Sequence, residues 1–500
     1  MSISKIVPLK VLKNKLKGKK FSLVHGVFDL LHIGHIRHFE EAKKFSDLLV
    51  VSITADKYVN KGPSKPVFKQ ELRSEFISSL TNVDYVYINY STTAVEIINE
   101  IKPNFYVKGV DYKNLKKDLS KNIYKEKSAT EKNGGKIVFS DNIQFSSSSL
   151  INENLLKYNP IGIKDKKIFK NGCFEALKKI ENLNIALIGE MIIDKYTFFN
   201  DLEKPSKEMI PAVEEKYSKI FLGGTYAIAK NLSEFCRKID LYVSGKIPKD
   251  VEKLINKEKK IFKNINTKIF KNDYHLIEKN RFIGNNGNKV FEIYKKNSKI
   301  NKLYDEKLNK FLQKKLKNYD VVILGDYGHG FVSSALKNII TKKSKYLSIN
   351  AQTNADNRGF NLITKYKKSD CVTIDLPELM LAVATRDKSI SEMSEELMKN
   401  IKCKNLIITK GKNGIHITSK NQKKNITHYF QPAFNTKPVD TIGAGDVVLG
   451  IASLLFKRKT DPDIVAFISN ILGALYIKIP GHEKNISKLE VMKSIEHLLK

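Results

Sequence analysis

The sequence contains only four cysteines, Cys173, Cys236, Cys371 and Cys403, and no two of them form a CxxC pair. Neither a disulfide framework nor a zinc site is therefore expected. The first twenty residues also lack the apolar core and small-residue cleavage site of a secretory signal. These absences together lead us to expect a cytoplasmic protein.

Long apolar runs are absent as well. The most apolar segments, residues 447–456 and 464–477, are shorter than the roughly 20 residues that a membrane-spanning helix needs. We therefore expect no membrane partner.

Arginine is scarce, although the formal net charge is +35. A strongly positive charge can indicate nucleic-acid binding, because lysine and arginine neutralise phosphates. Here arginine occurs at only seven positions, and the lysines are spread along the whole chain. We favour an ordinary lysine-rich surface and expect no nucleic-acid partner.

A chain of 500 residues exceeds what one compact core usually serves, so two or more domains are expected. From residue 21 to about 155, short β-rich runs at 21–28, 47–54, 84–88, 104–109 and 136–140 alternate with helical patterns. The helical patterns begin near Gly34, Gln70 and Thr92. Strands separated by helix-length segments predict a parallel sheet, and hence an α/β domain over residues 1–155.

A polar, lysine-rich segment at 156–182 is predicted to be a linker, and a second, larger α/β domain is predicted over 183–500. Its candidate strands are residues 184–190, 320–326, 345–350, 370–375 and 405–410, and two apolar helices follow them. The stretches 195–218 and 270–300 look like extended chain that interrupts this alternation. We expect them to form a small β lid.

The first chemical motif is "GVFDLLHIGHIRHFEEAKK" at residues 26–44. It follows a predicted strand and opens a helix, so free backbone amides and the positive end of the helix dipole meet at the carboxyl edge of the sheet. His32 and His35 could both face one anion there, and Gly34 would let a phosphate approach the backbone. Two histidines at this spacing could by themselves be incidental loop residues.

The whole string G-x-F-D-x-x-H-x-G-H resembles the signature of the nucleotidyltransferase superfamily, which includes glycerol-phosphate cytidylyltransferases and heptose 1-phosphate adenylyltransferases. The stretches "NKGPSKPVFKQELRSEF", "YVKGVDY" and "FSSSSLIN" resemble further family elements in the same order. This resemblance implies a Rossmann-like fold with His32, His35 and Lys43 as catalytic residues. The implied nucleotide-binding residues are Gly26, Phe28, Asp29, Gly34, Lys61, Arg73, Lys108, Gly109, Asp111, Ser146, Ser147 and Ser148.

One departure concerns the serine stretch, since relatives carry Ser-Thr-Thr where this chain has four serines. A polar turn would explain the serines if they stood alone. The implied reaction is attack by a phosphate monoester on the α-phosphorus of a nucleoside triphosphate, with release of pyrophosphate. Because the nucleophile is already an anion, holding the charges in line matters more than acid or base chemistry.

The second chemical motif is "PVDTIGAGDVVLGIASLLF" near the C-terminus. Gly443, Ala444 and Gly445 can form a turn of backbone amides that leads into a helix, and Asp446 falls at the start of that helix. A carboxylate there could equally be an ordinary N-terminal helix charge, and the four residues alone do not decide between the two.

With Asp440 and Thr441, the stretch resembles the D-T-x-G-A-G-D signature of ribokinase-like (PfkB) sugar kinases, and "IGEMIIDKY", "FLGGTYAIAKNL", "IDLPELMLA" and "TKGKNGIHI" resemble other family elements. The resemblance implies that Asp446 is the general base and that Glu378 acts near the metal. It also implies nucleotide binding by Gly411, Gly414, Gly443, Ala444 and Gly445, and sugar binding by Asp194, Gly223 and Gly224. The departures are Ala227 and Asp375, which stand where many relatives carry asparagine.

Two further stretches, "DYGHGFV" and "NAQTNADNRGFNLITKY", are dense in glycine and asparagine. Turns prefer these residues, so loop chemistry alone could explain them. Asp326 and Asn350 nevertheless follow apolar strands at the predicted carboxyl edge, and we expect them to line the sugar pocket. His329 has no assigned role.

The pair of domains resembles the bifunctional enzymes of ADP-heptose synthesis, with the domain order reversed. This implies a nucleotide-activated sugar as the product, Mg²⁺ as the cofactor, and ATP, with CTP possible, as the substrate beside a sugar phosphate. A homodimer is possible. Two other functions remain open: a CDP-alcohol-forming cytidylyltransferase fused to an unrelated sugar kinase, and a nucleic-acid-binding or regulatory protein with decayed sites.

Overall fold

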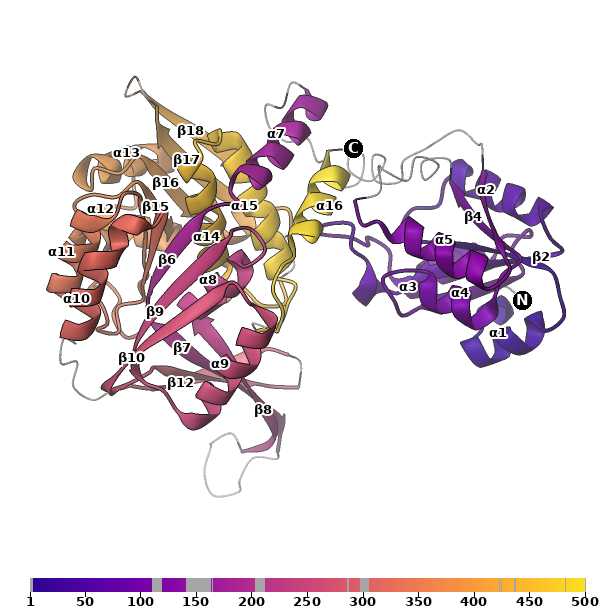
Figure 1. The fold of residues 1–500 in the computed structure, drawn as a ribbon, viewed down its shortest axis with the longest axis horizontal. Helices are drawn as coiled ribbons and strands as arrows, with labels where there is room; N and C mark the ends of the chain where they lie inside the picture. The colour runs from indigo at the N-terminus through magenta and orange to yellow at the C-terminus, as the bar shows by residue number, and fades with distance from the viewer. Residues whose placement is uncertain are drawn as a thin grey trace. The chain divides into compact units, whose positions relative to one another are not determined.

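The computed structural model describes residues 3–109, 119–140, 163, 165–202, 212–285, 287–296, 305–421, 423, 425–435, 438–481 and 483–499 (Figure 1). The chain divides into two compact units, of which the first comprises residues 1–170 and 489–500 and the second residues 171–488. Four predicted nucleotide-binding residues, Asp111, Ser146, Ser147 and Ser148, lie outside the described ranges.

A parallel sheet of five strands forms the centre of the first unit, in the order β3-β2-β1-β4-β5. The strands are β1 (Phe21–Gly26), β2 (Leu48–Thr54), β3 (Tyr85–Asn89), β4 (Phe105–Gly109) and β5 (Lys136–Ser140). Their positions confirm the five strands predicted from the sequence. Helices cover both faces of the sheet, which explains why a strand such as β2 reads as a nearly continuous apolar run.

The helices of the first unit are α1 (Leu9–Leu16), α2 (Ile33–Lys44), α3 (Gln70–Ser78), α4 (Val95–Ile101) and α5 (Asn122–Lys132). One core cluster contains buried residues of α1, α4 and α5, and another contains those of α2 and α3. Helices α2, α3 and α4 begin close to the predicted starts. Helices α1 and α5 were not predicted, because each buries only a few residues, and the buried positions of α5 include polar side chains, so little apolar period marks them.

The second unit contains a nine-stranded sheet in the order β10-β9-β6-β13-β14-β15-β16-β17-β18. The strands are β6 (Asn184–Gly189), β9 (Lys238–Lys246), β10 (Ile265–His275), β13 (Val321–Asp326), β14 (Leu347–Ala351), β15 (Cys371–Asp375), β16 (Asn405–Thr409), β17 (Ile415–Lys420) and β18 (Ile426–Gln431). Pairing is parallel from β10 to β16 and antiparallel beyond it. The parallel part confirms the predicted α/β architecture.

Helices pack on both faces of this sheet. The helices of this unit, in chain order, are α7 (Lys166–Lys179), α8 (Thr225–Leu232), α9 (Lys249–Ile261), α10 (Glu306–Lys315), α11 (Ser334–Lys343), α12 (Leu376–Val383), α13 (Ile390–Asn400), α14 (Ala444–Lys457) and α15 (Pro462–Tyr476). The last helix, α16 (Lys488–Leu498), falls almost wholly in the first unit. Helices α10, α11 and α13 share one core cluster with the strands. Helices α14 and α15 are buried along almost their whole length, which explains why they read as apolar without a clear period.

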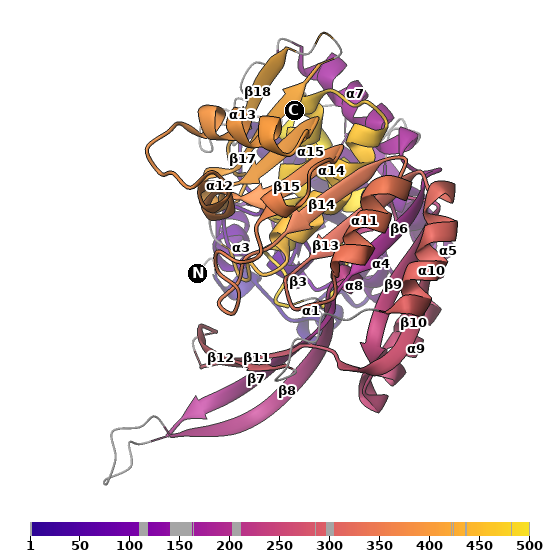
Figure 2. The same ribbon diagram turned by 90° about the vertical axis from the view of Figure 1, so that its left-hand side faces the viewer.

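A second, four-stranded sheet in the order β12-β11-β7-β8 confirms the predicted β lid. It consists of β7 (Met191–Asp201), β8 (Val213–Gly224), β11 (Glu278–Ile283) and β12 (Lys289–Lys295). Strands β7 and β8 form a long curved ribbon that extends beyond the nine-stranded sheet (Figure 2). We call these four strands the lid sheet.

The predicted linker, residues 156–182, differs from the structure in one respect. It contains helix α7, whose residues Cys173, Ala176 and Leu177 are buried, so that this part of the seam is ordered. The last residues, 489–500, group with the first unit, whereas the sequence assigned them to the second domain. In the part of the chain that the structure describes, no helix is long and apolar enough to cross a bilayer.

Candidate active sites

The sheet of the first unit has a topological switch point between β1 and β4. Strands β2 and β3 follow β1 on one side of it, and the chain then crosses over so that β4 and β5 lie on the other side. Ligands of open α/β sheets bind at such points, beside the carboxyl ends of the strands. Strand β1 ends at Gly26 and β4 ends at Gly109, so both predicted residues lie at this edge. The loop after β1 leads directly into α2.

His32 and His35 come together at the start of α2. His32 is the N-cap of the helix, and its Nδ1 accepts a hydrogen bond of 3.1 Å from the backbone N–H of Gly34. The two imidazole rings are stacked, with centroids 4.0 Å apart and planes inclined by 23°. The predicted pair of histidines at a helix N-terminus is therefore present, with both rings on one side of the helix.

Burial keeps both imidazoles neutral near pH 7. It lowers the pKa of His32 and is also the main reason that the pKa of His35 falls to about 3, with further contributions from His32, Lys61 and His38. A neutral imidazole can donate a hydrogen bond to a phosphate oxygen without being a proton source at this pH. The influence of Lys61 on His35 also indicates that this predicted residue lies near the pair.

Gly26, Phe28 and Asp29 support the histidine site. The ring of Phe28 packs edge-on against that of His35, with centroids 5.3 Å apart. A side chain at Gly26 would collide with the Phe28 ring. The carboxylate of Asp29 accepts hydrogen bonds from the backbone N–H groups of Val67 and Phe68, at 2.8 and 2.9 Å. Asp29 therefore fixes the loop before α3.

Lys43 does not join the histidines. It lies in the last turn of α2, about 12 Å along the helix from His35 at 1.5 Å per residue. Its ammonium donates to the carboxylate of Asp84 and to the backbone carbonyl of Asp47. The predicted catalytic role of Lys43 is corrected accordingly: the residue closes the C-terminal end of the helix.

Arg73 is buried and joins three segments of the chain. Its guanidinium donates to the carbonyls of Val27, Phe68 and Thr54, at 2.6, 2.9 and 2.9 Å, and to the Asp56 carboxylate at 2.6 Å. The predicted contact of Arg73 with phosphate is corrected to a structural role. These four acceptors use most of the N–H donors of the guanidinium, which leaves little capacity to bind a phosphate.

Substitution of Arg73 by methionine is expected to destabilise the first unit by about 1 to 3 kcal/mol, because it removes the buried guanidinium and leaves buried carbonyls without donors. Chemical denaturation of the full chain, followed by far-UV circular dichroism, measures this change. Lysine at 73 should recover only part of the loss. A variant that loses transferase activity with unchanged stability would contradict this structural role.

Lys108 lies in a buried polar cluster at the end of β4. Its ammonium is 3.2 Å from the Glu126 carboxylate, which also accepts from the Tyr106 hydroxyl at 2.9 Å and from the Ala94 N–H at 3.1 Å. His25, at the end of β1, is close enough for the charge of Lys108 to help lower its pKa, after burial, to about 4. Glu126 thus holds Lys108 beside the switch point.

Sequence reasoning missed His25 and His38. His25 lies one residue before the recognised motif, and His38 lies one helical turn after His35, where its Nδ1 is 2.7 Å from the Ser140 hydroxyl. Burial lowers the pKa of His38 to about 4, with Lys108 adding to the effect. The spacing of His32, His35 and His38 along one helix face was the signal that could have found it.

The first unit is expected to lose stability as the pH falls from 6.5 towards 4. His25, His35 and His38 have folded-state pKa values of about 4, 3 and 4, whereas in the unfolded chain they titrate near 6.5. In this window the unfolded state binds more protons, so acid favours unfolding, and the stabilisation is complete above pH 6.5. Melting curves of the full chain at several pH values test this. A melting temperature that stays constant from about pH 7 to about 4.5 would contradict it.

A cavity of about 610 Å³ lies in the second unit, between the lid sheet and the carboxyl ends of the parallel strands. It unites residues from five parts of the fold: the lid sheet, the loop after β14, the start of α12, the turn after β16, and the segment leading into α14. The predicted residues that line it are Asp194, Gly224, Asn350, Glu378, Gly411, Gly414, Gly443, Ala444, Gly445 and Asp446.

Asp446 and the glycine turn occupy the start of α14. Gly443 is the N-cap residue with φ of 82°, a left-handed conformation that favours glycine, and Asp446 lies in the first turn. Four N–H groups at such a helix start have no partner within the helix, and the helix dipole adds positive potential. Burial is the main reason that the pKa of Tyr327 is raised, and the nearby carboxylate of Asp446 adds to this effect.

The buried carboxylate of Asp440 holds this turn in place. It accepts from the N–H of Ile442 at 3.0 Å and from the N–H of Gly481 at 2.9 Å. It also accepts from the Tyr196 hydroxyl of β7 at 2.7 Å and pairs with Lys289 of β12. One side chain therefore connects the glycine turn with two strands of the lid sheet.

Glu378 and Asp375 provide carboxylates suited to a divalent cation. They form a capping box at the start of α12, and Glu378 additionally accepts from the Thr353 N–H at 2.8 Å. Burial raises the pKa of Glu378 to about 7, with Asp375 and Asp446 contributing, so a nearby cation would favour its ionised form. No group of three metal-ligating side chains occurs among the described residues. One or two carboxylates together with substrate phosphates are a common set of ligands for Mg²⁺.

Asp194 and Gly224 line the predicted sugar end of the cavity. The carboxylate of Asp194 pairs with Arg281, whose Nε donates to Glu292 at 3.2 Å. Gly224 is the N-cap of α8 with φ of 59°, and a Cβ there would lie 2.4 Å from the Glu190 carbonyl. Gly223 precedes it in β8 without lining the cavity. Arg281 was missed, because the segment that carries it was read only as extended chain.

Asn350 lines the cavity, as predicted, but Asp326 does not. Asp326 is buried, and its carboxylate is held by the Tyr366 hydroxyl, by Lys365 and by the Gly328 N–H. The expected sugar contact is therefore corrected to support of the loop after β13. Glu190 supports the same loop by accepting from the N–H groups of Tyr327 and His329, at 2.7 and 3.0 Å, and no motif had pointed to it.

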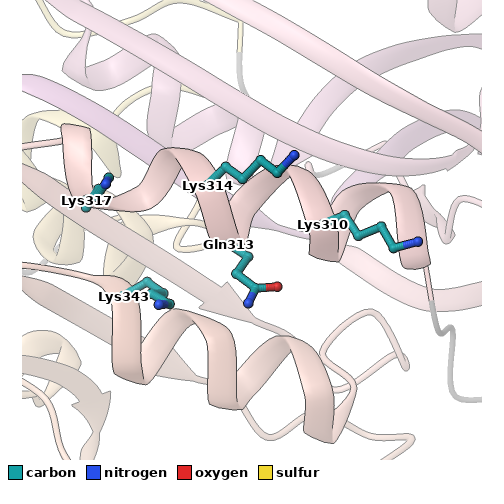
Figure 3. A pocket seen from close by; sticks show the side chains of 5 residues that line it. All are labelled: Lys310, Gln313, Lys314, Lys317 and Lys343. Carbon is teal, nitrogen blue, oxygen red and sulfur yellow. The ribbon is translucent and has the colours of Figure 1, made fainter.

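A second hollow, of about 620 Å³, lies between α10 and α11 (Figure 3). Its lining residues are Lys310, Gln313, Lys314, Lys317 and Lys343. None of these five side chains is a usual acid, base or nucleophile at neutral pH, and Lys310 pairs with Glu306 at 2.6 Å. Exposed lysines on helix faces are common, so this hollow provides little support for a functional site.

The fold, the lid sheet and the cavity define the second unit as a ribokinase-like carbohydrate kinase domain. The model of the pfkB family carbohydrate kinases matches residues 182–481, and the chain belongs to this family. A cytidylyltransferase-like model matches residues 23–154, so the N-terminal domain is cytidylyltransferase-like. Phosphofructokinase-2 from Escherichia coli has a similar fold, with a TM-score of 0.51 and 13% identity over 64% of this chain and all of that one.

Curated relatives match the N-terminal part. The protein named "Bifunctional protein HldE" from Aliarcobacter butzleri is 43% identical over 97 residues, which are 19% of this chain and 20% of the relative. The protein of the same name from Syntrophotalea carbinolica is 31% identical over 142 residues, 28% of each chain. The matched regions thus span only a fifth to somewhat more than a quarter of these two relatives.

Proposed function

We propose that this protein is a bifunctional enzyme, a sugar kinase and a sugar-phosphate nucleotidyltransferase, that makes a nucleotide-activated sugar of the ADP-heptose type for cell-surface glycans. The observation that supports this proposal is that one chain contains two separate helix starts whose chemistry suits a phosphate. One is the stacked pair His32 and His35 at the start of α2, and the other is Asp446 beside the glycine turn of α14.

In the kinase reaction, Asp446 would accept the proton of a sugar hydroxyl as that oxygen attacks the γ-phosphorus of ATP. The backbone N–H groups of residues 443–445 would bind the charge that develops on the transferred phosphoryl group. Glu378 and Asp375 would hold Mg²⁺, which neutralises phosphate charge when it is bound. Gly411 and Gly414, in the turn after β16, would flank the nucleotide.

In the transferase reaction, an oxygen of a sugar phosphate would attack the α-phosphorus of the nucleotide and release pyrophosphate. His32 and His35 would donate hydrogen bonds to the α-phosphate, and the N-terminus of α2 would add its positive potential. Lys61 and Lys108 would bind phosphate oxygens, with Lys108 held by Glu126. Asp111, Ser146, Ser147 and Ser148 remain proposals from the family resemblance.

The heptose assignment rests on the relatives named HldE and on the combination of the two domains, although the domain order is the reverse of the usual one. A second candidate deserves a test, because the N-terminal domain matches a family described as cytidylyltransferase-like. In that case the first unit would use CTP and make a CDP-alcohol, beside an independent sugar kinase.

Mass spectrometry of the products distinguishes these functions. The purified chain is incubated with Mg²⁺, with ATP or CTP, and with sugars, sugar phosphates and glycerol phosphate. A phosphorylated sugar together with an ADP-sugar supports the main proposal, whereas a CDP-alcohol supports the second candidate. If neither nucleotide is consumed with any acceptor, both proposals fail.

Three finer expectations accompany this proposal. We propose a cytoplasmic location, with which four free and buried cysteines are compatible. We also propose that the protein binds no nucleic acid, which a DNA-binding assay over a range of salt concentrations tests. The possible homodimer stays a prediction that size-exclusion chromatography with light scattering can decide.

A further inference from the structure

Tyr327 is a buried tyrosine in the wall of the kinase cavity. It directly follows β13, lines the same cavity as Asp446, and is only 1% exposed. Its ring packs over Gly325, where an added Cβ would lie 3.2 Å from a ring carbon and 3.5 Å from the hydroxyl oxygen. The side chain of Tyr327 therefore has little freedom to turn away from the cavity.

The backbone of Tyr327 is fixed as well. Its N–H donates to the carboxylate of Glu190 at 2.7 Å. Its carbonyl accepts from the side-chain amides of Asn354 and Asn357, at 2.8 and 3.0 Å. Such support from distant segments is typical of a residue whose side chain must keep one direction.

The hydroxyl of Tyr327 is buried, and no group in the described part of the chain accepts a hydrogen bond from it at ordinary geometry. Asp446 is the acid that acts on it most strongly. After burial, the charge of Asp446 and a hydrogen bond to its carboxylate raise the pKa of Tyr327, ahead of the charges of Glu190 and Asp194. Hydrogen bonds of catalytic groups are often long without substrate and tighten when it binds.

We propose that Tyr327 is a positioning residue of the kinase site, whose hydroxyl donates a hydrogen bond to the carboxylate of Asp446 and turns it toward the acceptor hydroxyl. This inference rests on the proposed kinase function and deepens it. An ionised carboxylate can only accept hydrogen bonds, so a protonated tyrosine is a suitable partner. A fixed donor selects one orientation of a carboxylate that could otherwise rotate.

Two other roles for Tyr327 give different results. If the tyrosine only fills space beside Gly325, loss of its hydroxyl changes stability but not turnover. If the hydroxyl instead contacts the sugar directly, its loss raises the KM for the acceptor. A residue that acts through Asp446 changes kcat, and only while Asp446 is present.

The test uses the full chain and steady-state kinase kinetics with ATP, and the acceptors are mannose and a heptose, each free and as a phosphate ester. Tyr327→Phe, which removes only the oxygen, is compared with Tyr319→Phe. Tyr319 is a matched control, because its buried hydroxyl also donates to a carboxylate, that of Asp240 at 2.6 Å, and it does not line the cavity.

In Tyr327→Phe we expect kcat to fall about tenfold to a hundredfold, the usual range for loss of a hydrogen bond to a charged group, while the KM values for ATP and the acceptor stay unchanged. In the Asp446→Asn background the same substitution should lower kcat no further, because no base is left to orient. Tyr319→Phe should leave both kinetic constants unchanged.

Three results would overturn the inference. They are an unchanged kcat in Tyr327→Phe, an effect confined to the acceptor KM, and an undiminished further loss of kcat in the Asp446→Asn background.

If wild type phosphorylates no acceptor, the proposed kinase function fails separately. Thermal melting of Tyr327→Phe, Asp446→Ala and the double variant then decides whether the two side chains act on each other. A combined loss smaller than the sum of the single losses supports the contact, and additive losses refute it.

Discussion

Replacement of Asp446 by asparagine is expected to lower kinase turnover by about 10² to 10⁴-fold, the usual effect of losing a general base. Asparagine keeps the size of the side chain and its place in the first turn of α14, but it cannot accept the proton of the sugar hydroxyl. Coupled measurement of ADP formation with a sugar acceptor gives the rate. Thermal melting should show a fold that is retained.

The matched control for this variant is Asp463→Asn. Asp463 lies in the first turn of α15, so it represents an ordinary carboxylate at a helix N-terminus. If Asp446 had only that role, both variants would lose similar, small amounts of stability and keep their activity. Kinase turnover of Asp446→Asn within a factor of two or so of wild type would refute its assignment as the base.

Replacement of His35 by alanine is expected to reduce pyrophosphate release by the transferase about a hundredfold or more, the usual effect of removing a donor to developing charge. The ring of His35 stacks on His32 and packs against Phe28, so the variant also loosens the partner histidine. A phosphate-release assay with added pyrophosphatase measures the rate. Glutamine at position 35 should recover part of the activity, because it can still donate a hydrogen bond.

The chain itself provides the internal control for His35→Ala. The kinase activity of the second unit should remain unchanged, which separates a local loss from a general loss of active protein. Glu40→Ala serves as a second control, since Glu40 is exposed on the same helix. Transferase activity of His35→Ala equal to that of Glu40→Ala would show that the imidazole has no part in the reaction.

Much of the fold could be predicted because the parallel strands are buried on both faces and therefore read as apolar runs at regular intervals. The strand ends then located the motifs, since Gly26 and Gly109 are the last residues of β1 and β4, and Gly443 is the N-cap of α14. Helices such as α5 escaped detection, because a short amphipathic helix in a lysine-rich chain has little apolar contrast.

Some site residues are oriented by local structure, and others by contacts with distant segments of the chain. His32 and His35 were predictable, because a helix start determines their placement locally. Arg73 and Asp326 were assigned to ligands, yet each is held by partners from distant segments. A motif specifies where a residue lies in the chain, whereas the direction of a long or charged side chain depends on tertiary neighbours.

The contacts of Asp440 have a consequence for how the kinase cavity fills. Any swing of β7 and β12 away from the nine-stranded sheet must break the bonds of Tyr196 and Lys289 to a carboxylate that also anchors Ile442. Movement of the lid sheet would therefore also remove contacts from the side chain that anchors the amide turn. We therefore expect a variant that loses these two lid contacts to bind ATP more weakly than wild type.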